Sequence, residues 1–140
     1  MPWNLEILHS LFIHFPIALF STSFACDLIA YMFKKDSSEN AGWWCLFFGL
    51  ISHVFAIITG FIADDLYGHF DFDLINFFDI HGLIQIFVFI PFLLIFIYRF
   101  NKNINKFSKQ IILIYFLVSG FSVLLLFYGS HLGALLSGRI

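Results

Sequence analysis

Residues 42–63, GWWCLFFGLISHVFAIITGFIA, form an apolar stretch that decides the fold class of this chain. The stretch contains no Asp, Glu, Lys or Arg. About 20 apolar residues in a helix are enough to cross the hydrocarbon core of a bilayer, which is ~30 Å thick. The segment therefore predicts a transmembrane helix.

Three more apolar stretches, at about 7–33, 75–98 and 110–136, have the same character. Across all 140 residues, 61% are hydrophobic and 11% charged, and the mean hydropathy is +0.93. A soluble fold could not cover so much apolar surface, so we expect a lipid bilayer around the chain. Short polar connections at 34–41, 64–74 and 99–109 imply antiparallel neighbours. We predict an all-α membrane protein whose single domain, 1–140, is an antiparallel bundle of four transmembrane helices.

The basic residues predict how the bundle is oriented. Six of the seven fall on one side of the predicted spans: Lys34, Lys35, Arg99, Lys102, Lys106 and Lys109. Lys and Arg accumulate on the cytoplasmic side of membrane proteins. We therefore expect a multi-pass protein of the bacterial inner (cytoplasmic) membrane with both termini outside.

Several function classes find no support in the sequence. The net charge of −2 and the seven Lys and Arg residues give no basic footprint for nucleic acid. No serine-histidine-acid order, phosphate loop or HExxH motif points to a hydrolase or an ATP-driven transporter. Whether the chain is an enzyme stays open, because a redox role needs none of these motifs.

Histidine is the residue type that stands out for chemistry. Five of the six histidines lie within or at the ends of the spans: His9, His14, His53, His81 and His131. Ionisable groups at membrane depth are costly and usually functional. At ~1.5 Å per residue, all five fall in the outer half or near the midplane, which predicts one site toward the periplasm. His9 and His14 are about 140° apart around their helix, so only one can face the interior, and we expect His14 to do so.

Neutral imidazoles in a helical bundle suit haem iron or a transition metal. We expect haem b, with His14 and His81 as the first ligand pair and His131, then His53, as alternatives. A metal site would use His14, His81 and His131. Gln85, Tyr128 and His9 would support the ligands from nearby. A homodimer sharing ligands, an unidentified redox partner, a metal-ion or proton carrier and a purely structural subunit are the alternatives.

Two further patterns concern helix packing. Small residues at seven-residue spacing, Gly42, Gly49, Ala56 and Ala63, predict a close-packed seam along the second span. Asp27 is a carboxylate within the first span, and we expect it to pair with Lys34, with a proton relay as the alternative.

The segment 8–19, LHSLFIHFPIAL, resembles the opening of a family of small bacterial membrane proteins of unknown function, whose first helix carries an HP-x-x-VHFPIAL pattern. Weaker similarities are Trp43-Trp44 with Gly49 and 59–61, TGF, then His81, then 128–132, YGSHL, which resembles a GGHL ending. Ser10 stands where the family has proline. The resemblance implies a four-helix membrane fold and, more loosely, a haem-binding or redox site that involves His9, His14, His81 and His131.

Overall fold

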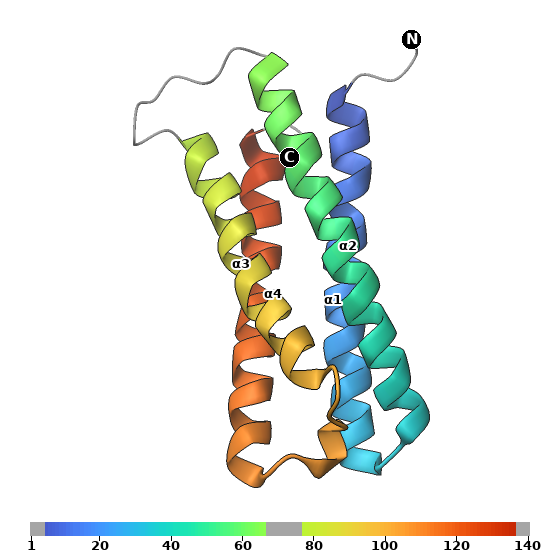
Figure 1. Ribbon diagram of the computed structural model, residues 1–140. Helices are drawn as coiled ribbons and strands as arrows, with labels where there is room; N and C mark the ends of the chain where they lie inside the picture. Colours follow the sequence, from blue (N-terminus) through green and yellow to red (C-terminus); the bar gives the residue numbers. More distant parts are fainter. Residues whose placement is uncertain (1–4, 67–76, 137–140) are drawn as a thin grey trace.

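Four long helices make up the fold (Figure 1). The structure, a computed structural model, describes the backbone of residues 5–66 and 77–136, and the side chains of residues 9, 11–62 and 82–135. The elements are α1 (Leu5–Phe33), α2 (Asp36–Leu66), α3 (Phe77–Arg99), the short 3-10 helix η1 (Ile104–Lys106) and α4 (Lys109–Leu136). Each α-helix contains a stretch long and apolar enough to cross a membrane. The predicted all-α bundle of four transmembrane helices is confirmed.

The connection between α1 and α2 is shorter than the predicted turn at 34–41. Lys34 takes a left-handed conformation, with φ of +53°, and ends α1, and α2 already begins at Asp36. Asp36 and Glu39 lie in the first turn of α2, where acidic side chains interact favourably with the helix dipole. The prediction missed this because it took polar residues as loop. The predicted acidic loop at 64–74 begins inside α2, and the rest of it, with His69, lies outside the described residues.

The helices alternate in direction, so both the α1–α2 and the α3–α4 connections lie at the same end of the bundle. The residues at this end differ chemically from those at the opposite end. We call the end with the α1–α2 and α3–α4 connections the lysine end, because Lys34, Lys35, Lys102, Lys106 and Lys109 all lie there. We call the opposite end, where α1 begins and α4 ends, the histidine end (Figure 1). The closest helix pairs are α1 with α2 and α3 with α4.

The tight α1–α2 pair rests on the predicted small-residue seam. Gly42, Gly49 and Ala56 are buried. A Cβ atom added at Gly49 would lie 2.8 Å from the ring of Phe20, and one added at Gly42 would overlap the Asp27 carboxylate. The described part of the seam is confirmed, since α1 can approach α2 this closely only where α2 has no side chain.

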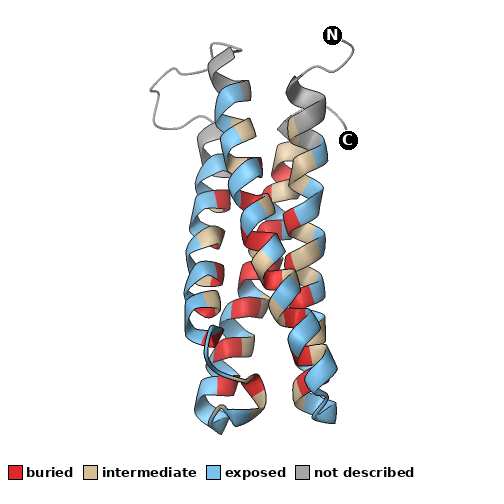
Figure 2. Cartoon of the chain, turned by 45° about the vertical axis from the view of Figure 1, so that its right-hand side comes forward, coloured by how far each residue is buried: buried red, intermediate tan, exposed pale blue. Residues whose placement is uncertain are grey.

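The interior is apolar, and so is the outer surface. At the centre, the rings of Phe20 on α1 and Phe92 on α3 stack with centroids 3.9 Å apart and planes 5° apart. Large apolar side chains also cover the outside, for example Phe87 at 66% and Leu124 at 69% exposed. Figure 2 shows the exposed residues along the outer face of every helix. In water such a surface would aggregate, so its solvent is lipid.

Candidate functional site

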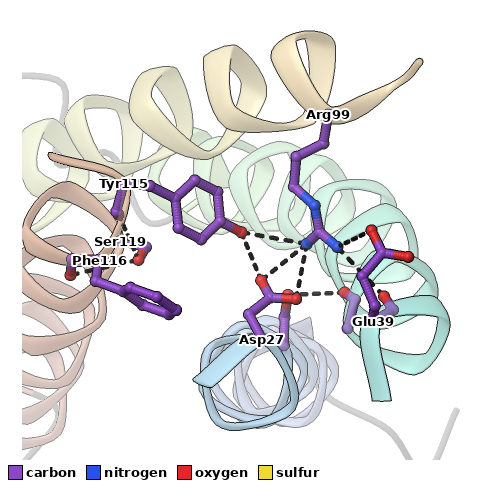
Figure 3. A network of polar contacts seen from close by, with 8 residues as sticks. Asp27, Glu39, Arg99, Tyr115, Phe116 and Ser119 are labelled. Atoms are coloured by element: carbon purple, nitrogen blue, oxygen red, sulfur yellow. Dashed lines mark hydrogen bonds and ion pairs between the residues drawn. The ribbon is translucent and has the colours of Figure 1, made fainter. Parts of the chain in front are cut away.

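A polar cluster near the lysine end takes one residue from each long helix (Figure 3). We call Asp27 of α1, Glu39 of α2, Arg99 of α3 and Tyr115 of α4 the polar clamp. Arg99 Nη1 donates to Asp27 Oδ1 and Oδ2, at 2.9 and 2.8 Å. Arg99 Nη2 donates to Glu39 Oε1 at 3.1 Å and to the Glu39 backbone oxygen at 3.2 Å. The Tyr115 hydroxyl donates to Asp27 Oδ2 at 2.5 Å. Four helices are therefore joined by one guanidinium and its acceptors.

The clamp corrects the predicted partner of Asp27. Lys34 does not reach the carboxylate, and its ammonium instead lies 4.5 Å from the centre of the Tyr31 ring. Asp27 and Arg99 are each only 1% exposed. The planar fork of Arg99 meets Asp27 through Nη1 and Glu39 through Nη2, so one cation joins two acidic side chains from different helices.

Sequence reasoning missed Glu39, Arg99 and Tyr115 as members of this cluster. One signal could have found Arg99, because a carboxylate inside a membrane span requires a cation at the same depth. Arg99 ends the third apolar stretch on the same side of the membrane as Asp27. No comparable signal marks Tyr115, which is one of two tyrosines in an apolar helix.

The clamp is suited to holding helices together. Both Asp27 oxygens and the Tyr115 hydroxyl are already engaged. The next polar group along α4, the Ser119 hydroxyl, donates back to the Tyr115 carbonyl at 2.7 Å. Among the described residues, no hydrogen bond continues from Asp27 toward the histidine end, so the proton relay gains no support.

Among the histidine side chains that the structure describes, His53 is the buried one, with 0% of its surface exposed. Its Nε2 lies 3.0 Å from the backbone oxygen of Gln85, which can only accept, so Nε2 carries the proton and joins α2 to α3. The ring lies between Phe20 and Phe89, at centroid distances of 5.6 and 5.7 Å. His53 Nδ1 and Gln85 Nε2 are buried without a hydrogen-bond partner in the described structure. Because aromatic rings enclose it, His53 is better placed to join helices than to meet a large ligand.

His9 and His14 occupy the opposite positions from those we expected. The Thr59 hydroxyl donates to the Phe55 carbonyl at 2.9 Å, so its oxygen can accept from His9 Nδ1 at 3.1 Å. His9 therefore faces α2. His14 is exposed rather than interior, because it lies two residues, about 200° around the helix, from the buried Pro16.

His131 is also exposed, and it lies at the level of His14. The contact between Phe24 and Gly120 aligns the two helices, since a Cβ at Gly120 would lie 3.4 Å from the Phe24 ring. His14 precedes Phe24 by ten residues and His131 follows Gly120 by eleven. At 1.5 Å per residue, both lie ~15 to 17 Å from that contact, toward the histidine end. Neither imidazole has a partner among the described residues.

The remaining candidates are only partly described. His81 lies in α3, but its side chain is outside the described residues. A Cβ at Gly129 would lie 2.8 Å from Ile84, so His81, one turn before Ile84, is close to the level of His131. Tyr128 is 57% exposed, and Gln85 is buried beside His53. In the described part of the chain, no three His, Cys, Asp or Glu side chains gather into a metal site.

Comparison with known proteins places the chain among membrane proteins. The family described as "Predicted membrane protein (DUF2231)" matches residues 6–140. No curated protein and no solved structure matches. The match agrees with the expected membrane family of unknown function and covers nearly the whole chain. The protein therefore belongs to the family of predicted membrane proteins designated DUF2231.

Proposed function

We propose that this protein binds haem b at the histidine end, with His14 and His131 as the axial ligands, and serves electron transfer, haem handling or redox sensing. The observation that carries the proposal is the position of these two imidazoles. They come from two helices that contact each other, they lie at one level, and both are exposed.

Both histidines lie where an unpaired polar group is unfavourable. His14 is about one turn inside the span that begins at Leu11, and His131 about one turn inside the span that ends at Leu135. A polar side chain that faces hydrocarbon without a partner costs free energy, so such residues usually serve a ligand or another chain. Histidine is a common ligand of haem iron, and these two imidazoles would hold the iron from two neighbouring helices.

The direction of the two side chains supports a shared ligand. On α4, Gly120 meets Phe24 of α1, and His131 is 11 residues from Gly120, about three turns, so it continues the stripe that faces α1. On α1, His14 lies about 80° around the helix from Phe24, on the side away from the buried Phe20. The two histidines therefore flank the outer side of the α1–α4 contact.

The neighbouring side chains suit a flat apolar ring. One turn deeper than the histidines lie Ile17 on α1, which is half-buried, and Phe127 on α4, which is 50% exposed. These residues offer apolar contacts and exclude water from beneath the imidazoles. An iron held by two imidazoles supplies one-electron chemistry. The residues of this chain would hold the ring and orient it toward a redox partner.

We also infer that the histidine end faces the periplasm of a bacterial inner membrane. The support is the charge distribution, since six of the seven Lys and Arg residues belong to the lysine end. Positive charge beside transmembrane helices marks the cytoplasmic side. The resemblance at 8–19 and 128–132 includes these two histidines, together with His9.

The ligand pair is tested by adding haem to detergent-purified variants. His14→Ala and His131→Ala should each lose the six-coordinate low-spin spectrum, while His9→Gln, a matched change on α1, should keep it. A haem-to-chain ratio near one would indicate a site within one chain, and a ratio near one half a homodimer with a shared haem. If His14→Ala and His131→Ala bind like the unaltered protein, this ligand pair is wrong, and loss in His81→Ala or His53→Ala would assign the haem elsewhere.

A further inference from the structure

We propose that the connection between α3 and α4 binds the phosphate group of an anionic phospholipid at the lysine end. The connection encloses a hollow of ≈ 270 Å³. The lining residues that carry the argument are Tyr98, Lys102, Lys106, Phe107, Ser108 and Ile111. The site is separate from the histidines and does not depend on the proposed haem.

The charge of the hollow favours an anion. Its lining contains two lysines and no Asp or Glu. Lys102 Nζ lies 4.2 Å from the centre of the Tyr98 ring, so the ammonium lies beside another residue that lines the hollow. In the described structure the ion pairs with carboxylates are those of Arg99, so Lys102 and Lys106 keep their charge available.

The Ser108 hydroxyl and the start of α4 complete the half of the site that would hold the phosphate group. The Ser108 side chain lines the hollow and directly precedes α4, which begins at Lys109. Ser108 Oγ accepts from the Ile111 N–H at 3.4 Å, and the partial positive charge at the start of α4 adds to the attraction of the two lysines for phosphate.

The backbone of the connection that carries the two lysines is anchored. Asn103 caps η1 by accepting a hydrogen bond from the Asn105 backbone N–H at 2.8 Å. Ile104 is fully buried, with 0% exposed, and η1 packs against α1. Lys102 and Lys106 stand on either side of this anchor. A preformed site loses less conformational entropy when it binds a ligand.

The depth and the apolar wall select a lipid over free phosphate. The hollow lies at the ends of the apolar spans Gly82–Arg99 and Lys109–Leu135, where the headgroups of a surrounding bilayer would lie. Tyr98 and Ile111, each 38% exposed, offer apolar surface beside the lysines. Free phosphate would contact only the lysines and other polar groups, whereas a phospholipid would contact these groups and the apolar surface as well.

A second hollow beside it is less suited to an anion. It shares Lys102 and Asn103 but is also lined by Glu39 and Arg99. The Arg99 charge is already matched by Asp27 and Glu39 at 2.8 and 3.1 Å. The Glu39 carboxylate would repel a phosphate, so we assign the lipid to the hollow between Lys102 and Lys106.

The test is lipid retention by the full chain, measured by native mass spectrometry after extraction from bilayers of phosphatidylcholine and phosphatidylglycerol. The unaltered protein should retain phosphatidylglycerol in preference. Lys102→Gln combined with Lys106→Gln should lower that retention by about tenfold, since each lysine near the surface contributes several-fold to the binding of anionic lipid. The control, Lys34→Gln with Lys35→Gln, removes the same charge at the same end but outside the hollow, and should retain the lipid.

The outcomes separate the explanations. If both double variants lose phosphatidylglycerol equally, the binding depends only on overall surface charge, and the proposed site is wrong. Equal retention of the two lipids by the unaltered protein would also overturn it. Full displacement of phosphatidylglycerol by millimolar inorganic phosphate would assign the hollow to free phosphate instead. Circular dichroism of each variant checks folding, and Lys106→Gln alone repeats the test if the double variant does not fold.

Discussion

Arg99 Nη1 lies 2.8 Å from Asp27 Oδ2 and thereby connects α3 to α1, two helices whose bonded residues are 72 positions apart in the chain. This contact links the close α1–α2 pair to the α3–α4 pair. Glu39 and Tyr115 extend the link to α2 and α4. The bundle is therefore held by apolar packing through its centre and by charge near its lysine end.

Removing one partner of this buried pair should strongly destabilise the protein. Asp27→Asn removes the negative charge but keeps the shape, which leaves Arg99 without its main counter-charge. Breaking a buried ion pair typically costs about 3 to 5 kcal/mol. We expect a loss of this size in the free energy of unfolding in detergent, measured by chemical denaturation. Asp36→Asn, an exposed acid at the start of α2, is the control and should change stability by less than ~1 kcal/mol. Similar stability of the two variants would argue against the clamp.

The seam between α1 and α2 makes a prediction about glycine. Gly49→Ala places a Cβ 2.8 Å from the Phe20 ring, so α1 and α2 must separate or Phe20 must move. Overpacking of this kind costs about 1 to 3 kcal/mol. At Gly82 on α3, an added Cβ meets nothing within 4 Å among the described residues. Gly82→Ala should therefore be neutral or stabilise the helix. A melting temperature that is lower for Gly82→Ala than for Gly49→Ala would contradict this packing.

His53 should matter for stability even without a cofactor. His53→Phe keeps a ring between Phe20 and Phe89 but leaves the Gln85 backbone oxygen without the N–H that now lies 3.0 Å away. The Gln85 oxygen keeps its bond within α3, so the variant loses one buried hydrogen bond between α2 and α3, which typically contributes about 0.5 to 1.5 kcal/mol. We expect a lower melting temperature for the haem-free variant. His131→Phe changes an exposed side chain and should leave the melting temperature of haem-free protein unchanged, and an equal fall in both would remove the distinction between these histidines.

The sequence predicted the spans and the small-residue seam because both depend on local composition. It overestimated the turn at 34–41, because it could not show that Asp36 and Glu39 would start a helix. It also gave Asp27 a near neighbour in the chain, Lys34, whereas the bundle supplied Arg99 from another helix. Such a choice depends on which faces of the four helices meet.

The histidines show the same limit. Spacing excluded a common direction for His9 and His14, but it did not say which one faces inward. Thr59, on α2, provides the hydrogen bond that accompanies the inward position of His9. Counting residues placed His14 and His131 in the same half of the bundle but at different depths, whereas the contact between Phe24 and Gly120 puts them at one level.

The proposed function is tested most directly by the visible spectrum of the detergent-purified protein, recorded oxidised and after reduction with dithionite. We expect a Soret band and sharp α and β bands in the reduced form, as two imidazole ligands on a b-type haem produce. A colourless protein that stays colourless after haem is added would contradict the proposal, and His14 and His131 would then serve another ligand or another chain.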